Sequence, residues 1–204
     1  MNFEQIPDPF ADQPDWAPRP PRPIVPVPAS GRVELRGQRV LVGLPGLGWR
    51  ADLRADEKVV QGSRTYVPVI AEHEWYRAEA EQVEVFAPLV PADRVWVETL
   101  GRNDDMAAAT PSRSDLLSRL VSLDAPVHRP PLPVMEAGSV SGRRVVQIVE
   151  ATERRDLRAV TEVYTGAEGD ICVRVTGEME WYRWAWSGQP PTTLEVPVHL
   201  LWLE

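Results

Sequence analysis

The sequence predicts a mainly β protein made of two tandem small barrels, one linker helix and a proline-rich N-terminal arm. The first observation is an internal repeat, because Glu74-Trp75-Tyr76-Arg77 returns as Glu180-Trp181-Tyr182-Arg183. The second is a series of short extended segments separated by Gly and Pro, which is typical of small barrels and sandwiches. The third is a single stretch of helical periodicity between the two copies.

The repeat extends well beyond this tetrapeptide. Asp52-Leu53-Arg54-Ala55 recurs as Asp156-Leu157-Arg158-Ala159, and Val95-Trp96-Val97-Glu98 recurs as Leu201-Trp202-Leu203-Glu204. The matches lie about 104 to 107 residues apart, a drift that fits short loop insertions. We therefore predict four segments, which are an acidic proline-rich arm over 1–21, a first barrel over 22–98, a linker over 99–128 and a second barrel over 129–204.

Alternating and apolar runs give the expected strands. In the first copy these lie over 24–28, 33–35, 38–44, 49–55, 65–77, 83–86 and 95–98, and in the second over 144–149, 155–164, 171–183 and 200–204. Pro68 interrupts the run over 65–77, which is therefore expected to be an edge or bulged strand. In the linker, the leucines between Ser112 and Leu123 form a helical stripe, with Thr110-Pro111 as its start signal.

Composition limits the possible functions. The net charge of −8 weighs against a general nucleic-acid binder, which needs a basic surface. No apolar run approaches the roughly 20 residues of a membrane helix, and the acidic, proline-broken start is unlike a signal peptide. We therefore expect a cytoplasmic protein, or one within a particle assembled in the cytoplasm. The abundance of Arg over Lys suggests a GC-rich genome, and we expect a bacterial or phage source.

No catalytic, metal or cofactor site is expected. His73 lies between Glu72 and Glu74, but on a strand the two carboxylates face one way and the imidazole the other. Cys172 lies in an apolar run with no His nearby, which indicates a buried thiol. A single cysteine also excludes an intrachain disulfide. The sequence therefore favours a protein that is not an enzyme.

Several stretches of each copy resemble the latter half of a Src-homology-3 domain. In the first copy these are the run from Gly62 to Ala78 and Leu89-Val90-Pro91, and in the second copy Gly169-Asp170-Ile171, Glu180-Trp181-Tyr182-Arg183 and Val196-Pro197-Val198. The resemblance covers about forty residues of each copy. It implies a small barrel whose groove binds proline-rich peptides, lined by Trp75 and Pro91 in the first copy and by Trp181 and Pro197 in the second.

A protein-interaction module is therefore the leading expectation, an adaptor or scaffold that binds proline-rich segments. Trp184 and Trp186 are candidates for exposed interface aromatics. The arm is expected to lie on a barrel surface, its own or a neighbour's, with Asp52, Asp56 and Glu57 as candidate partners for its arginines. Two alternatives stay open, a structural subunit of a phage virion or secretion assembly, and a nucleic-acid-binding tandem barrel.

Overall fold

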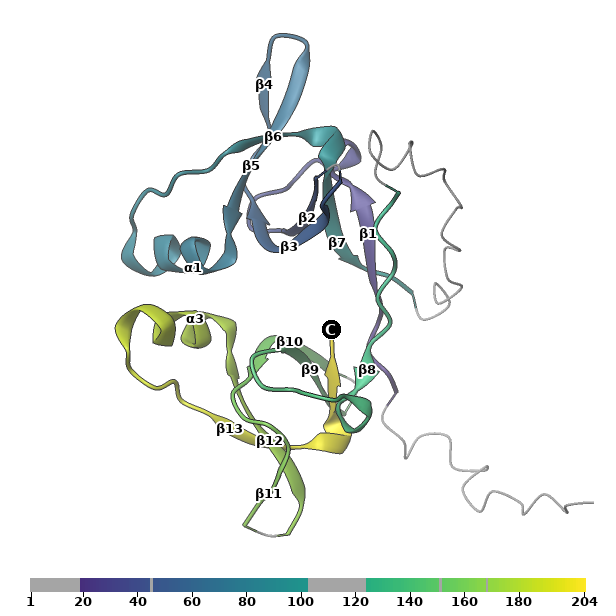
Figure 1. The fold of residues 1–204 in the computed structure, drawn as a ribbon, viewed down its shortest axis with the longest axis vertical. Helices are drawn as coiled ribbons and strands as arrows, with labels where there is room; N and C mark the ends of the chain where they lie inside the picture. Colours follow the sequence, from purple (N-terminus) through teal and green to yellow (C-terminus); the bar gives the residue numbers. More distant parts are fainter. Residues whose placement is uncertain (1–18, 45, 103–123, 151, 168) are drawn as a thin grey trace, which may run out of the picture.

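The computed structural model describes residues 19–44, 46–102, 124–150, 152–167 and 169–204. It contains two curled antiparallel half-barrel sheets, one from residues 24–100 and one from 132–203, each accompanied by a helix. Figure 1 shows the two sheets one above the other, with their helices facing each other across the middle. The predicted mainly β architecture is confirmed at this level.

The first sheet has the strand order β1-β7-β2-β3-β5-β4, and β6 pairs with β5 outside this path. Single-turn 3-10 helices η1 (Ala29–Gly31) and η2 (Ala92–Arg94) precede β2 and β7. The strands are β1 (Ile24–Pro28), β2 (Arg39–Leu44), β3 (Gly48–Ala55), β4 (Val59–Gln61), β5 (Arg64–Ala71), β6 (Leu89–Pro91) and β7 (Val95–Leu100).

The second sheet has the order β11-β12-β10-β9-β14-β8, and β13 pairs with β12. The 3-10 helices η4 (Val134–Glu136) and η5 (Val198–Leu200) again precede the second strand and the closing strand. The strands are β8 (Leu132–Pro133), β9 (Arg144–Val149), β10 (Thr152–Ala159), β11 (Tyr164–Thr165), β12 (Ile171–Gly177), β13 (Leu194–Pro197) and β14 (Leu201–Leu203).

Two predicted strands end earlier than the sequence suggested. The expected strands over 65–77 and 171–183 are wrong in their second halves, where helices α1 (Glu72–Glu81) and α3 (Glu178–Ser187) begin. Glu, Ala and Arg dominate α1 and favour helix there, whereas α3 combines such residues with three Trp. Each helix ends at a residue in the left-handed region, Gln82 at φ 53° and Gly188 at φ 69°.

Other expected elements have different outcomes. The segments 33–35 and 83–86 are loops rather than strands, and the run over 155–164 divides between β10 and β11. The linker helix expected over 112–123 lies outside the described residues, as does residue range 1–18 of the arm.

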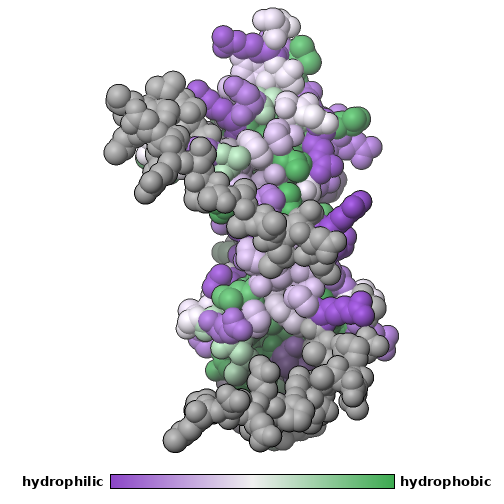
Figure 2. Space-filling model, turned by 90° about the vertical axis from the view of Figure 1, so that its right-hand side faces the viewer, coloured by the Kyte–Doolittle hydropathy of each residue, from purple (hydrophilic) through white to green (hydrophobic). Residues whose placement is uncertain are grey.

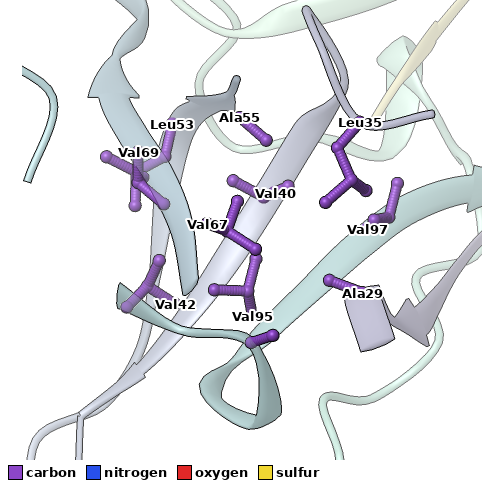
Figure 3. Close-up of a cluster of buried hydrophobic side chains, with 11 residues drawn as sticks. Ala29, Leu35, Val40, Val42, Leu53, Ala55, Val67, Val69, Val95 and Val97 are labelled. Carbon is purple, nitrogen blue, oxygen red and sulfur yellow. The ribbon is translucent and has the colours of Figure 1, made fainter. Parts of the chain in front are cut away.

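Each sheet closes over its own apolar core. In the first, Val40, Val67, Val95 and Val97 are each at most 2% exposed, and Figure 3 shows them pointing toward one another from β2, β5 and β7. Fully burying such a side chain contributes about 1.5–3 kcal/mol. The second core has the same character, with Val145, Val173, Leu201 and Leu203 at its centre. The cores are separate, so what joins the halves must be something else.

Prolines protect the outer edge of β1. Ile24 directs its N–H and C=O outward to Arg129, at the start of the second copy, at 3.0 Å in each direction. Pro26 and Pro28 follow at two-residue spacing, so they lie on the same outer edge. Because proline has no N–H, that edge offers few donors to a further strand.

The surface has no uniformly apolar side on the face shown in Figure 2, where hydrophilic and hydrophobic patches are intermixed around the grey atoms. Among the described residues, no helix is both long enough and apolar enough to cross a membrane.

Candidate functional site

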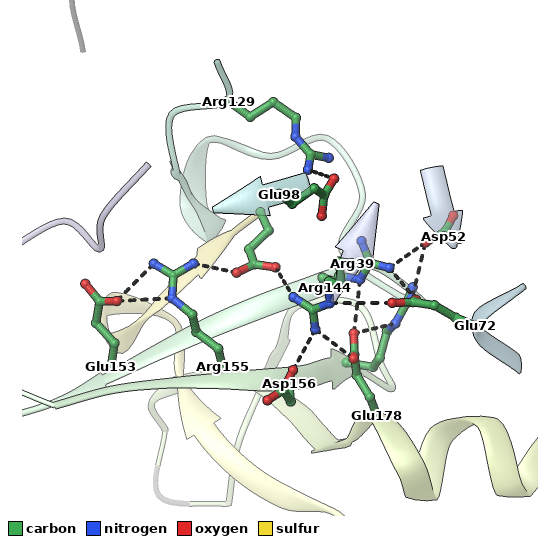
Figure 4. Close-up of polar contacts among 12 residues, drawn as sticks. Arg39, Asp52, Glu72, Glu98, Arg129, Arg144, Glu153, Arg155, Asp156 and Glu178 are labelled. Atoms are coloured by element: carbon green, nitrogen blue, oxygen red, sulfur yellow. Dashed lines mark hydrogen bonds and ion pairs between the residues drawn. The ribbon is translucent and has the colours of Figure 1, made fainter. Parts of the chain in front are cut away.

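A buried charge cluster lies between the two sheets. Its centre is a pair of glutamates, Glu72 at the first position of α1 and Glu178 at the first position of α3, whose side chains are 0% exposed. A helix N-terminus stabilises a carboxylate, because the backbone dipoles place positive charge there. A buried carboxylate also needs cationic partners, and both sheets provide them (Figure 4).

Glu72 is held by arginines of both halves. From its own half, Arg54 Nε lies 3.0 Å and Arg39 Nε 3.5 Å from Glu72 Oε1, as ion pairs that lack hydrogen-bond alignment. From the other half, Arg144 Nη2 donates to Glu72 Oε2, and Arg158 Nη2 lies 3.4 Å from the same oxygen. Each carboxylate oxygen therefore faces a different half of the protein.

Glu178 repeats this arrangement with the halves exchanged. Arg144 Nε lies 3.0 Å and Arg158 Nε 3.5 Å from Glu178 Oε1. Arg39 Nη2 lies 2.7 Å and Arg54 Nη2 3.2 Å from Glu178 Oε2. The four arginines thus bind both glutamates at once, and the interface is self-complementary in the manner of a two-fold symmetric contact.

Two tyrosines complete the centre of the cluster. The Tyr76 hydroxyl donates to Glu178 Oε2 at 2.8 Å, and the Tyr182 hydroxyl donates to Glu72 Oε2 at 2.9 Å. Their rings stack with centroids 5.1 Å apart. Arg54 and Arg158 each lie 5.2 Å from the ring centroid of the tyrosine in their own half, a cation–π distance.

Two β-bulges direct further carboxylates across the interface. Asp52 and Asp156 both have φ 58°, a left-handed conformation that Asp tolerates better than most residues. Each lies where the pairing with the neighbouring strand shifts register. As a result, Asp52 Oδ1 lies 2.8 Å from Arg144 Nη2, and Asp156 Oδ1 lies 2.8 Å from Arg39 Nη2.

The cluster continues to the segments that begin the two copies, residues 22–28 and 129–135, which we call the lead-in segments. Arg39 and Arg155 bind Glu204 at 3.1 and 2.6 Å, and Arg155 also binds Glu153 at 3.0 Å. Glu153 accepts from the Arg22 backbone N–H at 2.9 Å, so the Arg-Pro segment of the first copy lies on the second half.

The lead-in of the second copy crosses in the opposite direction. Arg129 donates to Glu98 in the first half and exchanges backbone hydrogen bonds with Ile24. Each copy is therefore joined to the other by an arginine of its own lead-in, Arg22 in one direction and Arg129 in the other. This reciprocal contact adds to the cluster between the helices.

Burial and charge shift the pKa values of the central groups in consistent directions. Burial alone would raise the pKa of Glu178, but Arg39 and Arg144 outweigh it and lower the pKa below its ordinary value. Burial, followed by the neighbouring glutamate of the other half, raises the pKa of both Tyr76 and Tyr182. At neutral pH the glutamate is therefore charged and both phenols are neutral donors.

The two central glutamates are fully engaged in contacts within the chain. Both oxygens of each central glutamate contact cationic or phenolic groups of the chain, which leaves neither as a base aimed at an open site. Among the described residues, no group of three or more His, Cys, Asp or Glu side chains is placed to hold a metal ion. Breaking a buried ion pair of this kind is strongly destabilising.

The predicted groove tryptophans lie on the helices rather than on strands. Trp75 packs over Gly37, where a Cβ would lie 3.5 Å from Trp75 Cζ2, and Trp181 packs over Gly142 in the same manner. Both glycines have positive φ, at 75° and 79°, so the turn favours glycine on conformational grounds as well. Both tryptophans are half-buried.

The predicted groove prolines begin the last 3-10 turns. Pro91 precedes η2 and Pro197 precedes η5, and both are half-buried. Pro91 pairs with Tyr66, whereas α1 starts after Ala71 at the far end of the same strand. The proline-peptide groove that would unite Trp75 with Pro91 stays a prediction.

The acidic residues expected to bind the arm have other partners among the described residues. Asp52 pairs with Arg144, and Asp56 accepts from the Glu57 backbone N–H at 2.8 Å and lies 4.0 Å from Arg36. Glu57 is exposed. Arg22, the first residue of the first copy, contacts Glu153.

The remaining candidate aromatics lie on α3. Trp184 is 37% exposed and meets Trp181 edge-on with centroids 5.7 Å apart, and Trp186 is half-buried. At the matching positions α1 carries Ala78 and Ala80. The two helices therefore share their buried face and differ on their outer face.

The sequence interpretation overlooked the arginines of the cluster. Arg39, Arg54, Arg144 and Arg158 were assigned to no site, although their segments match between the copies. The signal was present, because charged residues retained at matching positions beside apolar ones indicate a shared polar contact. Reading 72–76 at helical spacing would have placed Glu72 and Tyr76 on one face.

Comparisons with protein-family models, with curated proteins and with solved structures find no match to this chain.

Proposed function

We propose that the protein is a non-catalytic protein-interaction scaffold, built from two small barrels that are held in one fixed relative orientation. The observation that carries this proposal is the complete internal pairing of the buried charge cluster. The residues best suited to acid–base chemistry, Glu72 and Glu178, are bound by four arginines and two tyrosines of the same chain. Such a joint fixes the spacing of the two outer surfaces.

The barrels are proposed to be of the Src-homology-3-like kind, joined by duplication. Support comes from the order of elements after the helix in each half, namely a Val-Pro strand, a single 3-10 turn and a closing strand. The paired aromatics depart from that pattern because they lie on helices. Recognition of proline-rich segments is part of the same proposal, with a cytoplasmic location.

The outer face of α3 is the favoured contact surface. Trp184 lies exposed there beside Trp181, and exposed Trp residues are enriched at the energetic centres of protein interfaces. Edge-on aromatic pairs also suit polyproline ligands, which aromatic-lined surfaces recognise as preformed helices. The first half, with alanines in place of Trp184 and Trp186, supplies an internal comparison.

The test is binding of a synthetic Arg-Pro-Pro-Arg-Pro peptide, the sequence of residues 19–23, to the full chain by tryptophan fluorescence. We expect a saturable change in the wild type that Trp184→Ala removes and Trp184→Phe partly retains, with the melting temperature of both variants unchanged. Ala78→Ser on α1 is the matched control and should bind as the wild type does. Equal binding by Trp184→Ala would contradict the assignment.

A structural subunit of a larger particle is the second candidate. The β4–β5 hairpin protrudes from the first sheet in Figure 1, and Val60 at 70% exposure lies on it. Exposed apolar hairpins of this kind suit contacts between subunits. Sedimentation of the purified protein distinguishes the two proposed functions. A scaffold is expected to stay monomeric, whereas an assembly subunit is expected to form large species.

A further inference from the structure

A pocket of about 350 Å³ opens into the first half-barrel, on a site different from the surface of α3. It is lined by the buried core residues Val42, Leu53 and Val69 and by Phe86, which is 84% exposed. Small-molecule sites have volumes from about 300 Å³ upward and are mostly apolar with a few polar groups at defined places. This pocket meets both conditions.

Two residues of opposite charge line the pocket, Arg50 on β3 and Glu74 on α1. Both are exposed, and neither has a hydrogen-bond or ion-pair partner within the part of the chain that the structure describes. In this respect they differ from most charged residues of the interface, which are paired. An unpaired cation and an unpaired anion over one apolar pocket suit a ligand with both charges.

Glu74 lacks an ion-pair partner among the described residues for a reason that lies in the helix sequence. On α1, Arg77 binds Glu81 one turn later at 2.8 Å, which leaves Glu74 unpaired. On α3 the residue matching Glu81 is Ser187, and Arg183 binds Glu180 instead. The two halves therefore differ in whether the carboxylate at this position is available.

The pocket lining differs between the halves as well. At the positions that match Val42 and Phe86, the second half has Gln147 and Thr192. Gln147 is buried and polar, so the corresponding place is a poorer environment for an apolar group. Both differences make the first half the more suitable site for an amphipathic ligand.

We infer that this pocket binds a small zwitterion with a large apolar side chain, that is, an apolar α-amino acid or a very short apolar peptide. The side chain enters the pocket against Leu53 and Val69, the ammonium group binds the Glu74 carboxylate, and the carboxylate binds the Arg50 guanidinium. This inference is independent of the scaffold function, because it uses neither the charge cluster nor the outer face of α3.

The experiment titrates L-phenylalanine into the full chain and follows the valine and leucine methyl signals by two-dimensional NMR. A ligand of this size is expected to bind in the millimolar range. Methyl shifts are expected at Val42, Leu44, Leu53, Val69 and Val90. Shifts confined to other residues, or none at tens of millimolar ligand, would overturn the inference.

Two blocked ligands identify each charge contact. N-acetyl-L-phenylalanine lacks the ammonium group and L-phenylalaninamide lacks the carboxylate, and each should bind about two- to fivefold more weakly than phenylalanine, since exposed charge pairs contribute modestly. Glu74→Gln should weaken phenylalanine and phenylalaninamide while leaving the acetylated ligand unchanged. Arg50→Gln should weaken phenylalanine and the acetylated ligand while leaving phenylalaninamide unchanged.

The second half supplies matched control variants. Glu180→Gln and Arg154→Gln remove the corresponding charges there and should leave phenylalanine binding unchanged. All four substituted residues lie outside the cores, so the variants are expected to fold. Two results would show that Arg50 and Glu74 do not recognise the ligand. One is equal affinity of the wild type for all three ligands, and the other is a loss of phenylalanine affinity in the control variants as large as that in the Glu74 and Arg50 variants.

Discussion

Tyr76 and Tyr182 stack at the centre of the molecule, with ring centroids 5.1 Å apart and an interplanar angle of 21°. Each hydroxyl donates to the glutamate of the opposite half, Tyr76 to Glu178 and Tyr182 to Glu72. The stack and the two hydrogen bonds form one unit that neither half can make alone. The two small cores are thus joined through aromatic and ionic contacts rather than through a shared apolar core.

Removal of one hydroxyl tests the contribution of these hydrogen bonds. Tyr76→Phe keeps the ring stack but leaves Glu178 with one donor fewer, so it should lower the free energy of unfolding by about 1–3 kcal/mol. Tyr182→Phe should have an effect of the same size. Tyr66→Phe on β5 is the control, because the Tyr66 hydroxyl has no partner among the described residues. Urea unfolding measures the free energy of unfolding of all three variants. A loss of the same size in Tyr66→Phe as in the other two would contradict the role of the two hydroxyls.

Neutralising a central glutamate should have a larger effect. Glu72→Gln and Glu178→Gln each leave four guanidinium groups around a single carboxylate, and the free energy of unfolding should fall by about 3–5 kcal/mol. Glu79→Gln, on the exposed face of α1, should change it by less than about 0.5 kcal/mol. Unfolding curves of the three variants give the comparison. A loss below 1 kcal/mol at both central positions would show that the cluster is not what joins the halves.

Stability should be limited at both ends of the pH range. The pKa of Glu178 is lowered in the folded protein, so its contribution is present above the unfolded value near 4.5 and is lost as the pH falls through the lower folded value. The pKa values of Tyr76 and Tyr182 are raised, so their contribution is present below the unfolded value near 10 and is lost as the pH rises.

Thermal melting from acid to alkaline pH measures this profile. A plateau is expected between the two limits, and Tyr76→Phe combined with Tyr182→Phe should flatten the alkaline decline. The Tyr66→Phe variant should retain the wild-type alkaline decline. An unchanged alkaline decline in the double variant would contradict the role of the two phenols.

The bulge aspartates separate a charge effect from a backbone effect. Asp52→Asn retains a side chain that tolerates positive φ but removes the ion pair with Arg144, and because Asp52 is largely exposed the loss should be at most about 1 kcal/mol. Asp52→Ala should cost about 1 kcal/mol more, because alanine at φ 58° is strained. Denaturant unfolding measures the free energy of unfolding of both variants. Equal losses in Asp52→Asn and Asp52→Ala would mean that the positive φ at this position does not affect stability.

The location of the site was only partly predictable. Matching segments such as Asp52-Leu53-Arg54-Ala55 and Asp156-Leu157-Arg158-Ala159 marked the relevant strands, and the sequence interpretation proposed Asp52 as a binding residue. The partner that the structure gives Asp52 was not foreseen. Asp52 binds Arg144, which is 92 residues away in the chain, because a bulge turns its carboxylate toward the other half. Neither a register shift between strands nor a contact between the two halves leaves a recognisable pattern in the local sequence.

The sequence by itself determined the mainly β class and the matching order of apolar segments in the two copies, because strand periodicity depends on neighbours close in the chain. Only the tertiary structure decided that Glu72 and Glu178 are buried, and that 72–81 and 178–187 are helical. A glutamate is stable without water only when cations surround it, and here the cations come from both halves at once. Arginines so far apart in the chain meet around a carboxylate only after both sheets have formed and packed.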